Sequence, residues 1–247
     1  MYYYKLPIVD CKLTNFQLSI IIPALNEAEN LAELLPDIQQ KAAGKAVEII
    51  VIDGGSRDQT IEIAQRLGAK AMVSPRGGRA AQMNFGATVA QSNVLYFVHA
   101  DGRLPTRFVE DIEQAVATGY EAGCYRFRFD SEAFMLKING FCTRFNALTF
   151  RGGDQTLFIS RSLFEAIGGF DEHYVIMEDY DIIRRIWAKN RQLFKVIQKD
   201  VIVSARKYET NSWLRVQLAN LRAMISFNQN KPPQEIAKQY KKMLNYR

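Results

Sequence analysis

The sequence predicts an α/β fold in which helices lie on both faces of an open, mostly parallel sheet. Short apolar runs typical of buried parallel strands recur between residues 18 and 118. Segments with the helical spacing of apolar residues lie between these runs, and the links are short. Regular alternation of strands and helices with short links indicates parallel βαβ units.

The first predicted strand covers residues 18–23 and ends at a proline, and a helix follows it. We expect Asn26 to cap this helix and Pro36 to break or kink it. The second strand, "VEIIVID", runs into a glycine turn, where Ser56 or Asp58 is expected to cap the next helix. A short third strand, "AKAMVS", precedes a glycine-rich loop that opens into the helix of "RGGRAAQMNFGATVAQ".

The fourth strand covers residues 94–98, and the regular alternation ends after Gly119. The later elements are expected in the order half-exposed strand (124–129), long helical stretch (132–150), strand and helix (155–170), amphipathic helix (177–190) and basic tail helix after "NKPPQE". These changes divide the chain into an N-terminal extension (1–17), a first half (18–118), a second half (119–230) and a basic C-terminal tail (231–247).

Composition limits the function. The chain of 247 residues has no apolar run long enough to span a membrane, and its first residues do not resemble a secretory signal. Three widely spaced cysteines and two histidines indicate neither a disulfide framework nor a His-rich metal site, which favours a reducing cytoplasm. Residues 184–247 carry 15 Lys/Arg against 3 Asp/Glu, whereas residues 1–183 carry 17 against 23. The basic part predicts either an anionic partner or a solvated helix face.

Polar side chains follow three predicted strands. Glu27 follows the first strand, Asp53 ends the second, and His99 and Asp101 follow the fourth. In an open parallel sheet, ligands bind beyond the carboxyl ends of the strands, so three acids are expected to meet there. Carboxylates bind a hard divalent cation, and such a cation binds phosphate oxygens. Each acid taken alone could equally be a turn former or a helix-start charge.

Five segments together carry a resemblance to a known family. The segments are "SIIIPALNEAENL", "VEIIVIDGGSRDQT", "GRAAQMNFGA", "VLYFVHADGRLP" and "MEDYDIIRRI". In this order they resemble the family 2 glycosyltransferases with the GT-A fold, and in particular a small bacterial subgroup of soluble members whose substrates are poorly defined. The resemblance covers roughly residues 17–230. It implies inverting transfer of a sugar from a nucleoside diphosphate donor to a hydroxyl acceptor, with Mn²⁺ or Mg²⁺ as cofactor.

The resemblance also implies roles for individual residues. Asp101 matches the second acid of the family's D-x-D metal motif, and Asp179, preceded by Glu178, matches the catalytic base. His99 stands where many members have aspartate, so it either ligates the metal or bonds the ribose or diphosphate. The remaining positions that match the nucleotide-binding segments are Pro23, Asn26, Glu27, Asp53, Ser56, Asp58, Arg79, Gln82, Asn84 and Gly86.

The acceptor side is less defined. Gly153, Asp154 and Gln155 suit an acceptor loop or a tight turn. Trp213, a further acceptor candidate, begins a segment with apolar residues at helical spacing, which suits packing against the core or a membrane surface. These apolar residues are Leu214, Leu218, Leu221 and Ile225. The expected partners are the donor, a hydroxyl acceptor that is lipid-linked or bears phosphate, and the inner face of an anionic membrane, but no nucleic acid.

Two other classes remain open at this stage. A nucleotidyltransferase that makes nucleotide sugars would share the sheet and the metal, but it normally has a basic, glycine-rich loop after the first strand. The corresponding loop here, "PALNEAEN", is acidic and lacks glycine. A non-catalytic nucleotide-binding module is the second alternative, and the presence of both Asp101 and Asp179 disfavours it.

Overall fold

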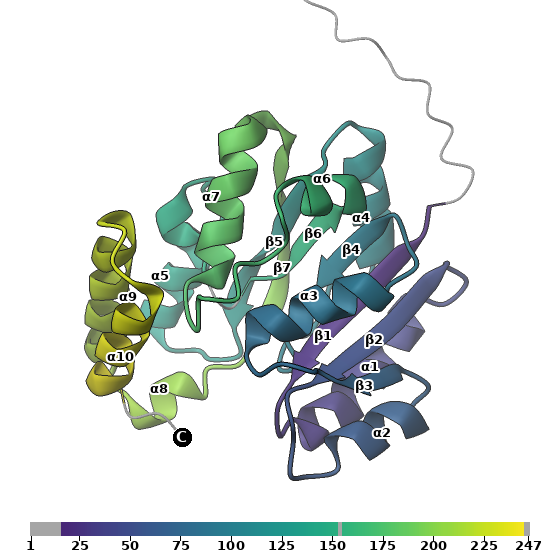
Figure 1. Ribbon diagram of the computed structural model, residues 1–247, viewed down its shortest axis with the longest axis horizontal. Coiled ribbons are helices and arrows are strands. Elements are labelled where there is room, and N and C mark those ends of the chain that lie inside the picture. Colours follow the sequence, from purple (N-terminus) through teal and green to yellow (C-terminus); the bar gives the residue numbers. More distant parts are fainter. Residues whose placement is uncertain (1–15, 153–154, 245–247) are drawn as a thin grey trace, which may run out of the picture.

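A computed structural model describes residues 16–152 and 155–244 of the chain. Its centre is one seven-stranded sheet in the order β3-β2-β1-β4-β6-β5-β7 (Figure 1). The strands are β1 (Leu18–Ala24), β2 (Val47–Asp53), β3 (Lys70–Val73), β4 (Val94–Phe97), β5 (Ala122–Phe129), β6 (Leu157–Ser160) and β7 (Phe194–Val203). Strands β1 to β4 are mutually parallel, and β6 runs antiparallel to both of its neighbours. The predicted open, mostly parallel sheet is confirmed.

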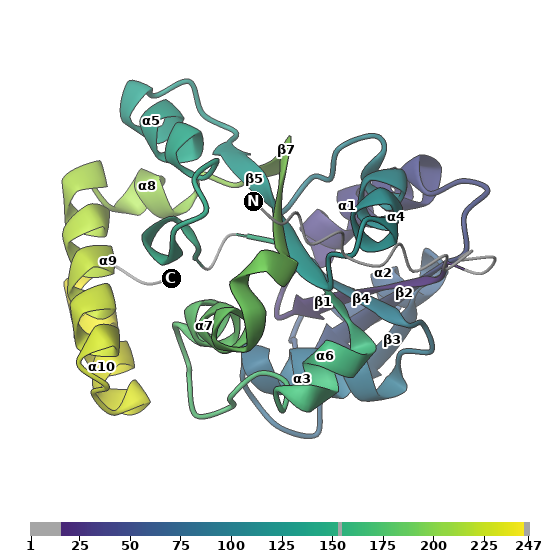
Figure 2. The ribbon, with the colours of Figure 1, turned by 90° about the horizontal axis from the view of Figure 1, so that it is seen from above.

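Helices cover both faces of the sheet, as predicted. The helices are α1 (Ala28–Lys41), α2 (Thr60–Arg66), α3 (Arg79–Val89), α4 (Phe108–Ala117), α5 (Phe134–Cys142), α6 (Arg161–Ala166), α7 (Glu178–Asn190), α8 (Lys207–Thr210), α9 (Trp213–Asn228) and α10 (Pro233–Met243). Figure 2 shows α1 and α4 on one side of the sheet and α3, α6 and α7 on the other. Side chains of β1 alternate between two buried clusters, because successive residues of a strand point to opposite faces.

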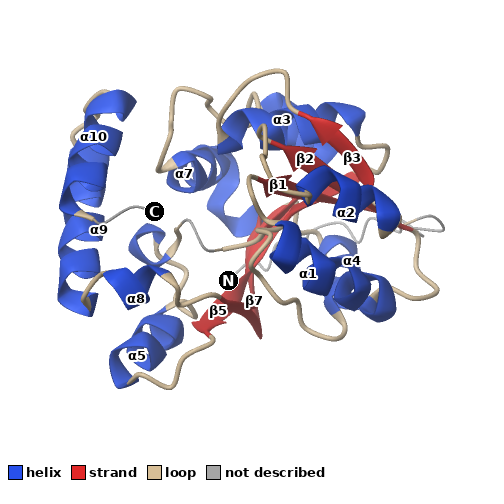
Figure 3. Cartoon of the chain, turned by 90° about the horizontal axis from the view of Figure 1, so that it is seen from below, coloured by secondary structure: helices blue, strands red, loops and turns tan. Residues whose placement is uncertain are grey.

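The C-terminal helices form a separate group. A third buried cluster joins α9 and α10 to the segment before α7, through residues such as Val216, Phe227, Ile236 and Met177. Helices α5, α8, α9 and α10 lie at the end of the molecule away from α2 and β3 (Figure 3). Within the described residues, no helix combines the length and the apolar character needed to cross a bilayer.

Several local predictions were wrong. Asn26 does not cap α1, which begins after Glu27 without a side-chain cap, and Pro36 does not break the helix, which continues to Lys41. The N-cap position of α2 is Gln59 rather than Ser56 or Asp58, but the Asp58 carboxylate accepts the first backbone N–H of the helix, that of Thr60, at 3.1 Å. The half-exposed character expected of residues 124–129 is confirmed, since Cys124, Tyr125 and Phe129 are buried whereas Arg126, Phe127 and Arg128 are partly or fully exposed.

The second half departs further from its predictions. Residues 132–150 form α5 and a short 3-10 turn, η1 (Leu148–Phe150), rather than one long helix. Strand β7, which a second short turn, η2 (Arg191–Leu193), precedes, was not predicted. The four apolar residues of α9 that were expected either to pack against the core or to meet a membrane are all exposed. The predicted extension lies outside the described residues except for positions 16 and 17.

Candidate active site

The loops after β1, β2 and β4 share one edge of the sheet. These strands are neighbours and parallel, so their carboxyl ends lie side by side. The backbone N–H of Gly54 donates to the carbonyl of Ala24 at 2.8 Å, and that of Val98 donates to Ile21 at 3.0 Å. Pro23 is buried within β1, just before this edge. The expected convergence of Glu27, Asp53 and Asp101 at one edge therefore has a structural basis.

Side chains tie the first two loops together. The hydroxyl of Ser56 accepts the backbone N–H of Asn26 at 2.8 Å, and the side-chain oxygen of Asn26 accepts that of Arg57 at 2.9 Å. Asn26 adopts a left-handed backbone conformation, with φ of 55°, which asparagine tolerates better than most residues. Asp58 accepts the backbone N–H of Ala28 at 3.2 Å. The side-chain hydrogen bond from Thr60, its strongest influence, lowers the pKa of Asp58.

Asp53 is the most enclosed acid of this edge. Its side chain is 1% exposed, and its carboxylate accepts the backbone N–H groups of Gly55 and Ser56 at 2.8 and 2.9 Å, as well as the Ser56 hydroxyl. These bonds leave roughly one of the four acceptor positions of a carboxylate for a ligand. The buried amide of Gln82 lies against the same turn and donates to the carbonyls of Ala24 and Ile52. Gln82 thereby fixes the first turns of α3 against the ends of β1 and β2.

Gly86 lies where α3 crosses β1. A Cβ atom at this position would meet Cγ2 of Ile21 at 2.4 Å and Cγ1 of Ile52 at 3.2 Å. Contacts this short do not occur between real side chains, so glycine allows the helix to approach the sheet closely. The structure thus explains Gly86 by packing.

Arg79, at the start of α3, joins this edge to α7. Its guanidinium forms an ion pair with Glu178 and contacts Oδ2 of Asp179 at 3.3 Å. The side chain of Glu178 is fully buried and that of Asp179 nearly so. Since Gln82 lies one turn further along the same helix, the two acids are held close to the ends of β1 and β2. Residues almost 100 positions apart in the sequence therefore meet as one group.

The start of α7 is built by two further features. Met177 precedes the helix with φ of 74°, a left-handed conformation that is rare for such a side chain. The buried Asp181 forms ion pairs with Arg184 at 3.2 Å and Arg185 at 2.7 Å. Arg185 also donates to the carbonyl of Gly169 at 2.7 Å. Arg185 thus links Asp181 of α7 to the backbone of the segment that precedes the helix.

Arg206 is a site residue that the sequence analysis missed. It follows β7, and its Nη2 atom lies 2.9 Å from Oε1 of Glu27 and 3.4 Å from Oδ2 of Asp101. The loop that carries His99 and Asp101 is fixed to β7 by two backbone hydrogen bonds between Arg103 and Ile202. Because β7 itself was not predicted, no sequence signal placed Arg206 beside these acids.

The residues around Asp101 fit a divalent cation. A cation held against a diphosphate needs only one or two carboxylates, because water and phosphate supply its other ligands. Among the described residues, no group of three or more His, Cys, Asp or Glu side chains is suited to a metal ion. Glu27 and Asp101 nevertheless approach the same guanidinium nitrogen of Arg206, so the position between them favours positive charge. This donor set fits a metal ion that is completed by its ligand.

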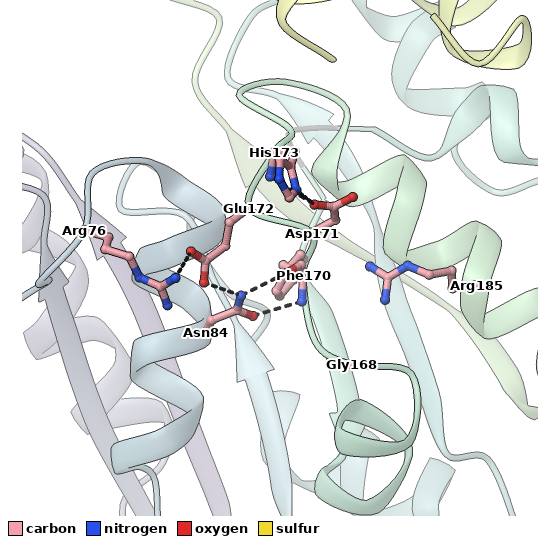
Figure 4. A pocket seen from close by; sticks show the side chains of 8 residues that line it. All are labelled: Arg76, Asn84, Gly168, Phe170, Asp171, Glu172, His173 and Arg185. Carbon is pink, nitrogen blue, oxygen red and sulfur yellow. Dashed lines mark hydrogen bonds and ion pairs between the residues drawn. The ribbon is translucent and has the colours of Figure 1, made fainter. Parts of the chain in front are cut away.

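Asn84, which follows Arg79 on α3, lines an open pocket between α3 and the segment before α7 (Figure 4). Its amide donates to Glu172 and to the carbonyl of Phe170, both at 2.9 Å, and accepts the N–H of Phe170. Glu172 also forms an ion pair with Arg76 at 2.7 Å. Asn84 therefore joins α3 to the 168–173 segment, and its contacts give it a structural role.

The predicted acceptor residues are only partly described. Gly153 and Asp154 lie outside the described residues. Gln155 is buried and accepts a hydrogen bond at 3.3 Å from Arg151, a fully buried arginine that also donates to the thiol of Cys124. Trp213 is partly buried against the main core at the start of α9. The contacts of Gln155 and Trp213 are internal to the protein.

Comparison with known proteins shows which protein family the chain matches. The model of the family "Glycosyl transferase family 2" matches residues 19–170. The succinoglycan biosynthesis protein ExoA of Rhizobium meliloti is 26% identical over 204 residues, which cover 71% of this chain and 59% of the relative. The chain thus spans less than two thirds of that relative's length.

Solved structures show the same fold. Staphylococcus aureus TarS (residues 1–349) superposes with a TM-score of 0.64 at 16% identity, covering 91% of this chain and 68% of that one. Glucosyl-3-phosphoglycerate synthase from Mycobacterium tuberculosis, in complex with Mn²⁺, uridine diphosphate and glucosyl-3-phosphoglycerate, gives 0.64 at 17% identity. That match covers 89% of this chain and 81% of the other. These neighbours are GT-A glycosyltransferases, so the predicted fold type is confirmed.

Proposed function

The chain belongs to glycosyl transferase family 2, and on that premise we propose that it transfers a sugar, with inversion, from a nucleoside diphosphate donor to a hydroxyl acceptor. One observation carries the proposal: each half of the chain extends an arginine to the acids of the other. Arg79 from the first half pairs with Glu178 and Asp179, and Arg206 from the second half pairs with Glu27 and Asp101. Donor and acceptor groups would meet between these two sets of acids.

The donor would lie along the edge formed by β1, β2 and β4. Asp53 would meet the nucleotide with the acceptor position that its hydrogen bonds leave, and hydrogen bonds of Asn26, Ser56 and Asp58 tie the loops around it together. Glu27, Asp101 and His99 would face the diphosphate and its metal. Structural neighbours that are crystallised with uridine diphosphate and Mn²⁺, or with GDP-mannose and Mn²⁺, support this class of donor. Gly86, Gln82 and Asn84 would support the site through packing and hydrogen bonds.

Asp179 would act as the general base. As the acceptor oxygen attacks the anomeric carbon, its proton passes to the carboxylate, and the bond between that carbon and the diphosphate breaks. A bound divalent cation would neutralise the charge that develops on the leaving diphosphate. Glu178, fully buried beside Asp179, would hold Arg79 in place. In this proposal Glu178 is a positioning residue, and Asp179 is the acid that takes part in the reaction.

The acceptor is proposed to be a hydroxyl compound that is lipid-linked or carries phosphate. The 15 Lys/Arg against 3 Asp/Glu in residues 184–247 favour an anionic partner. Gln155, Trp213 and the undescribed Gly153 and Asp154 stay candidates for contact with it. Cys124 and Cys142 are free thiols, which supports a reducing compartment such as the cytoplasm. A place at the inner face of an anionic membrane is part of the proposal.

The proposal is tested with a panel of sugar nucleotides in the presence of Mn²⁺. One donor family should raise the melting temperature, because a ligand that binds only the folded state stabilises it. Release of free nucleoside diphosphate should then appear when acceptor hydroxyl compounds are added. The control Asp37→Asn alters a carboxylate of α1 that pairs with Lys41, and it should behave as the wild type. A protein that no sugar nucleotide stabilises would contradict the proposal.

A further inference from the structure

The exposed face of α9 is unusually apolar. Leu214, Leu218, Leu221 and Ile225 are between 48% and 60% exposed. With about 100° between successive residues, these four side chains fall within about 60° of one another. The opposite face of α9, which includes Val216, Ala219, Ala223 and Phe227, is buried against α10 and the segment before α7. The helix is therefore apolar on two opposite sides, and the structure buries only one of them.

A second exposed apolar cluster lies at the same end of the molecule. Phe134, Ile138 and Phe141 share one face of α5, and the exposed rings of Phe141, Phe145 and Phe150 follow one another at about 6 Å. Figures 2 and 3 both place α5 and α9 at the end away from β3. Nine of the twelve large hydrophobic residues that are exposed in the described chain belong to these two segments. Such a concentration marks an interaction surface rather than scattered exposure.

The surroundings of the α9 stripe are basic. Residues 211–244 contain six Lys/Arg and one Asp/Glu. Arg215 and Arg222 lie about 60–100° from the centre of the stripe on one flank, and α9 itself contains no acid. The one acid of this region, Glu235, lies 3.8 Å from Lys231. An apolar stripe with one cationic flank, on a helix without acids, complements a surface that is apolar inside and anionic outside.

We infer that the exposed face of α9, assisted by the aromatic residues of α5, docks the protein in the headgroup region of an anionic membrane. A second copy of the chain suits this surface less well, because two α9 helices in contact would bring Arg215 and Arg222 of both copies together without an acid to pair them. The stripe also consists of leucine and isoleucine, whereas protein interfaces draw most of their affinity from Trp, Tyr and Arg. The inference deepens the membrane placement in the proposed function by assigning it to α9, and it does not depend on the transfer reaction itself.

Flotation with vesicles tests the inference on the full chain. The wild type should bind vesicles of phosphatidylcholine mixed with phosphatidylglycerol at low salt, and should bind pure phosphatidylcholine at least about tenfold more weakly, because several basic residues contribute about 1 kcal/mol each. The triple variant Leu214→Gln, Leu218→Gln, Leu221→Gln should bind the anionic vesicles at least about tenfold more weakly than the wild type. These side chains are exposed, so the variant should melt close to the wild type.

Matched controls separate the stripe from general effects. Val73→Gln with Val175→Gln removes equally exposed apolar side chains elsewhere, and should leave vesicle binding unchanged. Arg215→Gln with Arg222→Gln should weaken binding to anionic vesicles about five- to thirtyfold and reduce its salt dependence. Phe134→Ser with Phe141→Ser should reduce binding less than the α9 triple variant does.

Two results would overturn the inference. In the first, the wild type does not bind anionic vesicles at low salt, or the triple variant binds them equally well. In the second, light scattering shows that the wild type is a dimer and the triple variant a monomer, while neither protein binds vesicles. The second result would assign the stripe to a copy of the chain instead. Donor-dependent thermal stabilisation of the wild type, measured in parallel without lipid, keeps a failure of this inference distinct from a failure of the proposed transferase function.

Discussion

The two halves of the chain are built in different ways. In the first half, residues 18–118, four parallel strands alternate with helices, and the loops at their carboxyl ends are tied to one another by side chains such as Asn26 and Ser56. In the second half, residues 119–230, an antiparallel strand interrupts the sheet, the pairing of β5 with β7 shifts register between Tyr125 and Arg126, and α5 and α9 expose apolar faces. Side chains join the loops of the first half at one edge of the sheet, whereas the second half leaves apolar surface exposed.

Two arginines cross between the halves at the candidate site. Arg79 and Arg206 cross between them in opposite directions, and each pairs with two acids of the other half. If the first half binds the donor and the second supplies the base, changes in one half should affect binding and changes in the other should affect turnover. Substitutions at Asp179, Asp101 and Arg206 test this division, and a pair of glycine substitutions compares the packing of the two halves.

The largest effect is expected in the second half. Asp179→Asn should leave donor affinity within about twofold, but lower turnover roughly 100-fold or more, because general base catalysis typically contributes that much. Donor affinity is measured by calorimetry and turnover by release of nucleoside diphosphate with a working acceptor. Asp200→Asn, which alters an acid of β7 that pairs with Arg126, should preserve both quantities. Near-normal turnover in Asp179→Asn would reduce this residue to a helix-start charge.

The next effect belongs to the first half. Asp101→Asn should remove the gain in nucleoside diphosphate affinity that Mn²⁺ provides, about tenfold or more, because even partners outside the direct ligands of a metal typically change its affinity about 10–100-fold. Calorimetric titrations with and without Mn²⁺ measure this gain. Glu33→Gln removes a nearby exposed charge that pairs with Arg103, and should preserve it. If Asp101→Asn and wild type gain equally from Mn²⁺, the cation is held elsewhere.

The sequence predicts the regular first half better than the irregular second half. The first half could be predicted because each buried strand is a continuous apolar run and each helix shows one apolar face. Strand β7 could not, because it lies at the sheet edge and carries Lys195, Gln198, Lys199 and Asp200 among its apolar residues. The partners of Arg79 and Arg206 could not be predicted either, since the contacts join positions about 100 and 180 residues apart. The helical spacing of apolar residues in α9 predicted an apolar face. It could not predict that the fold would bury the opposite face instead.

Substitution of one glycine in each half by alanine tests how tightly a helix of that half packs against the sheet. Gly86→Ala should destabilise the protein by about 1–3 kcal/mol, because the new Cβ would meet Ile21 and neither α3 nor β1 can move freely. Gly140→Ala, on α5, would place its Cβ 3.1 Å from the carbonyl of Phe127, a milder contact. The higher helix propensity of alanine should offset much of that cost, which leaves a change of about 1 kcal/mol or less. Thermal unfolding of both variants measures the difference, and equal losses would mean that the two halves are packed equally tightly.

The smallest effect concerns the arginine that the second half extends to the first. Arg206 lies within 3.4 Å of both Glu27 and Asp101, where its positive charge would compete with the proposed metal ion for the same carboxylates. Arg206→Gln should therefore tighten the binding of Mn²⁺ in the absence of nucleotide. The gain should be about two- to fivefold, because an ion pair with a half-exposed arginine contributes only about 0.2–1 kcal/mol. Paramagnetic titration of Mn²⁺ measures this affinity, with Arg103→Gln as a control that removes an exposed arginine paired with Glu33. If Arg206→Gln weakens Mn²⁺ binding, the arginine orders the two acids for the metal, and the site depends on the second half for its shape as well as its charge.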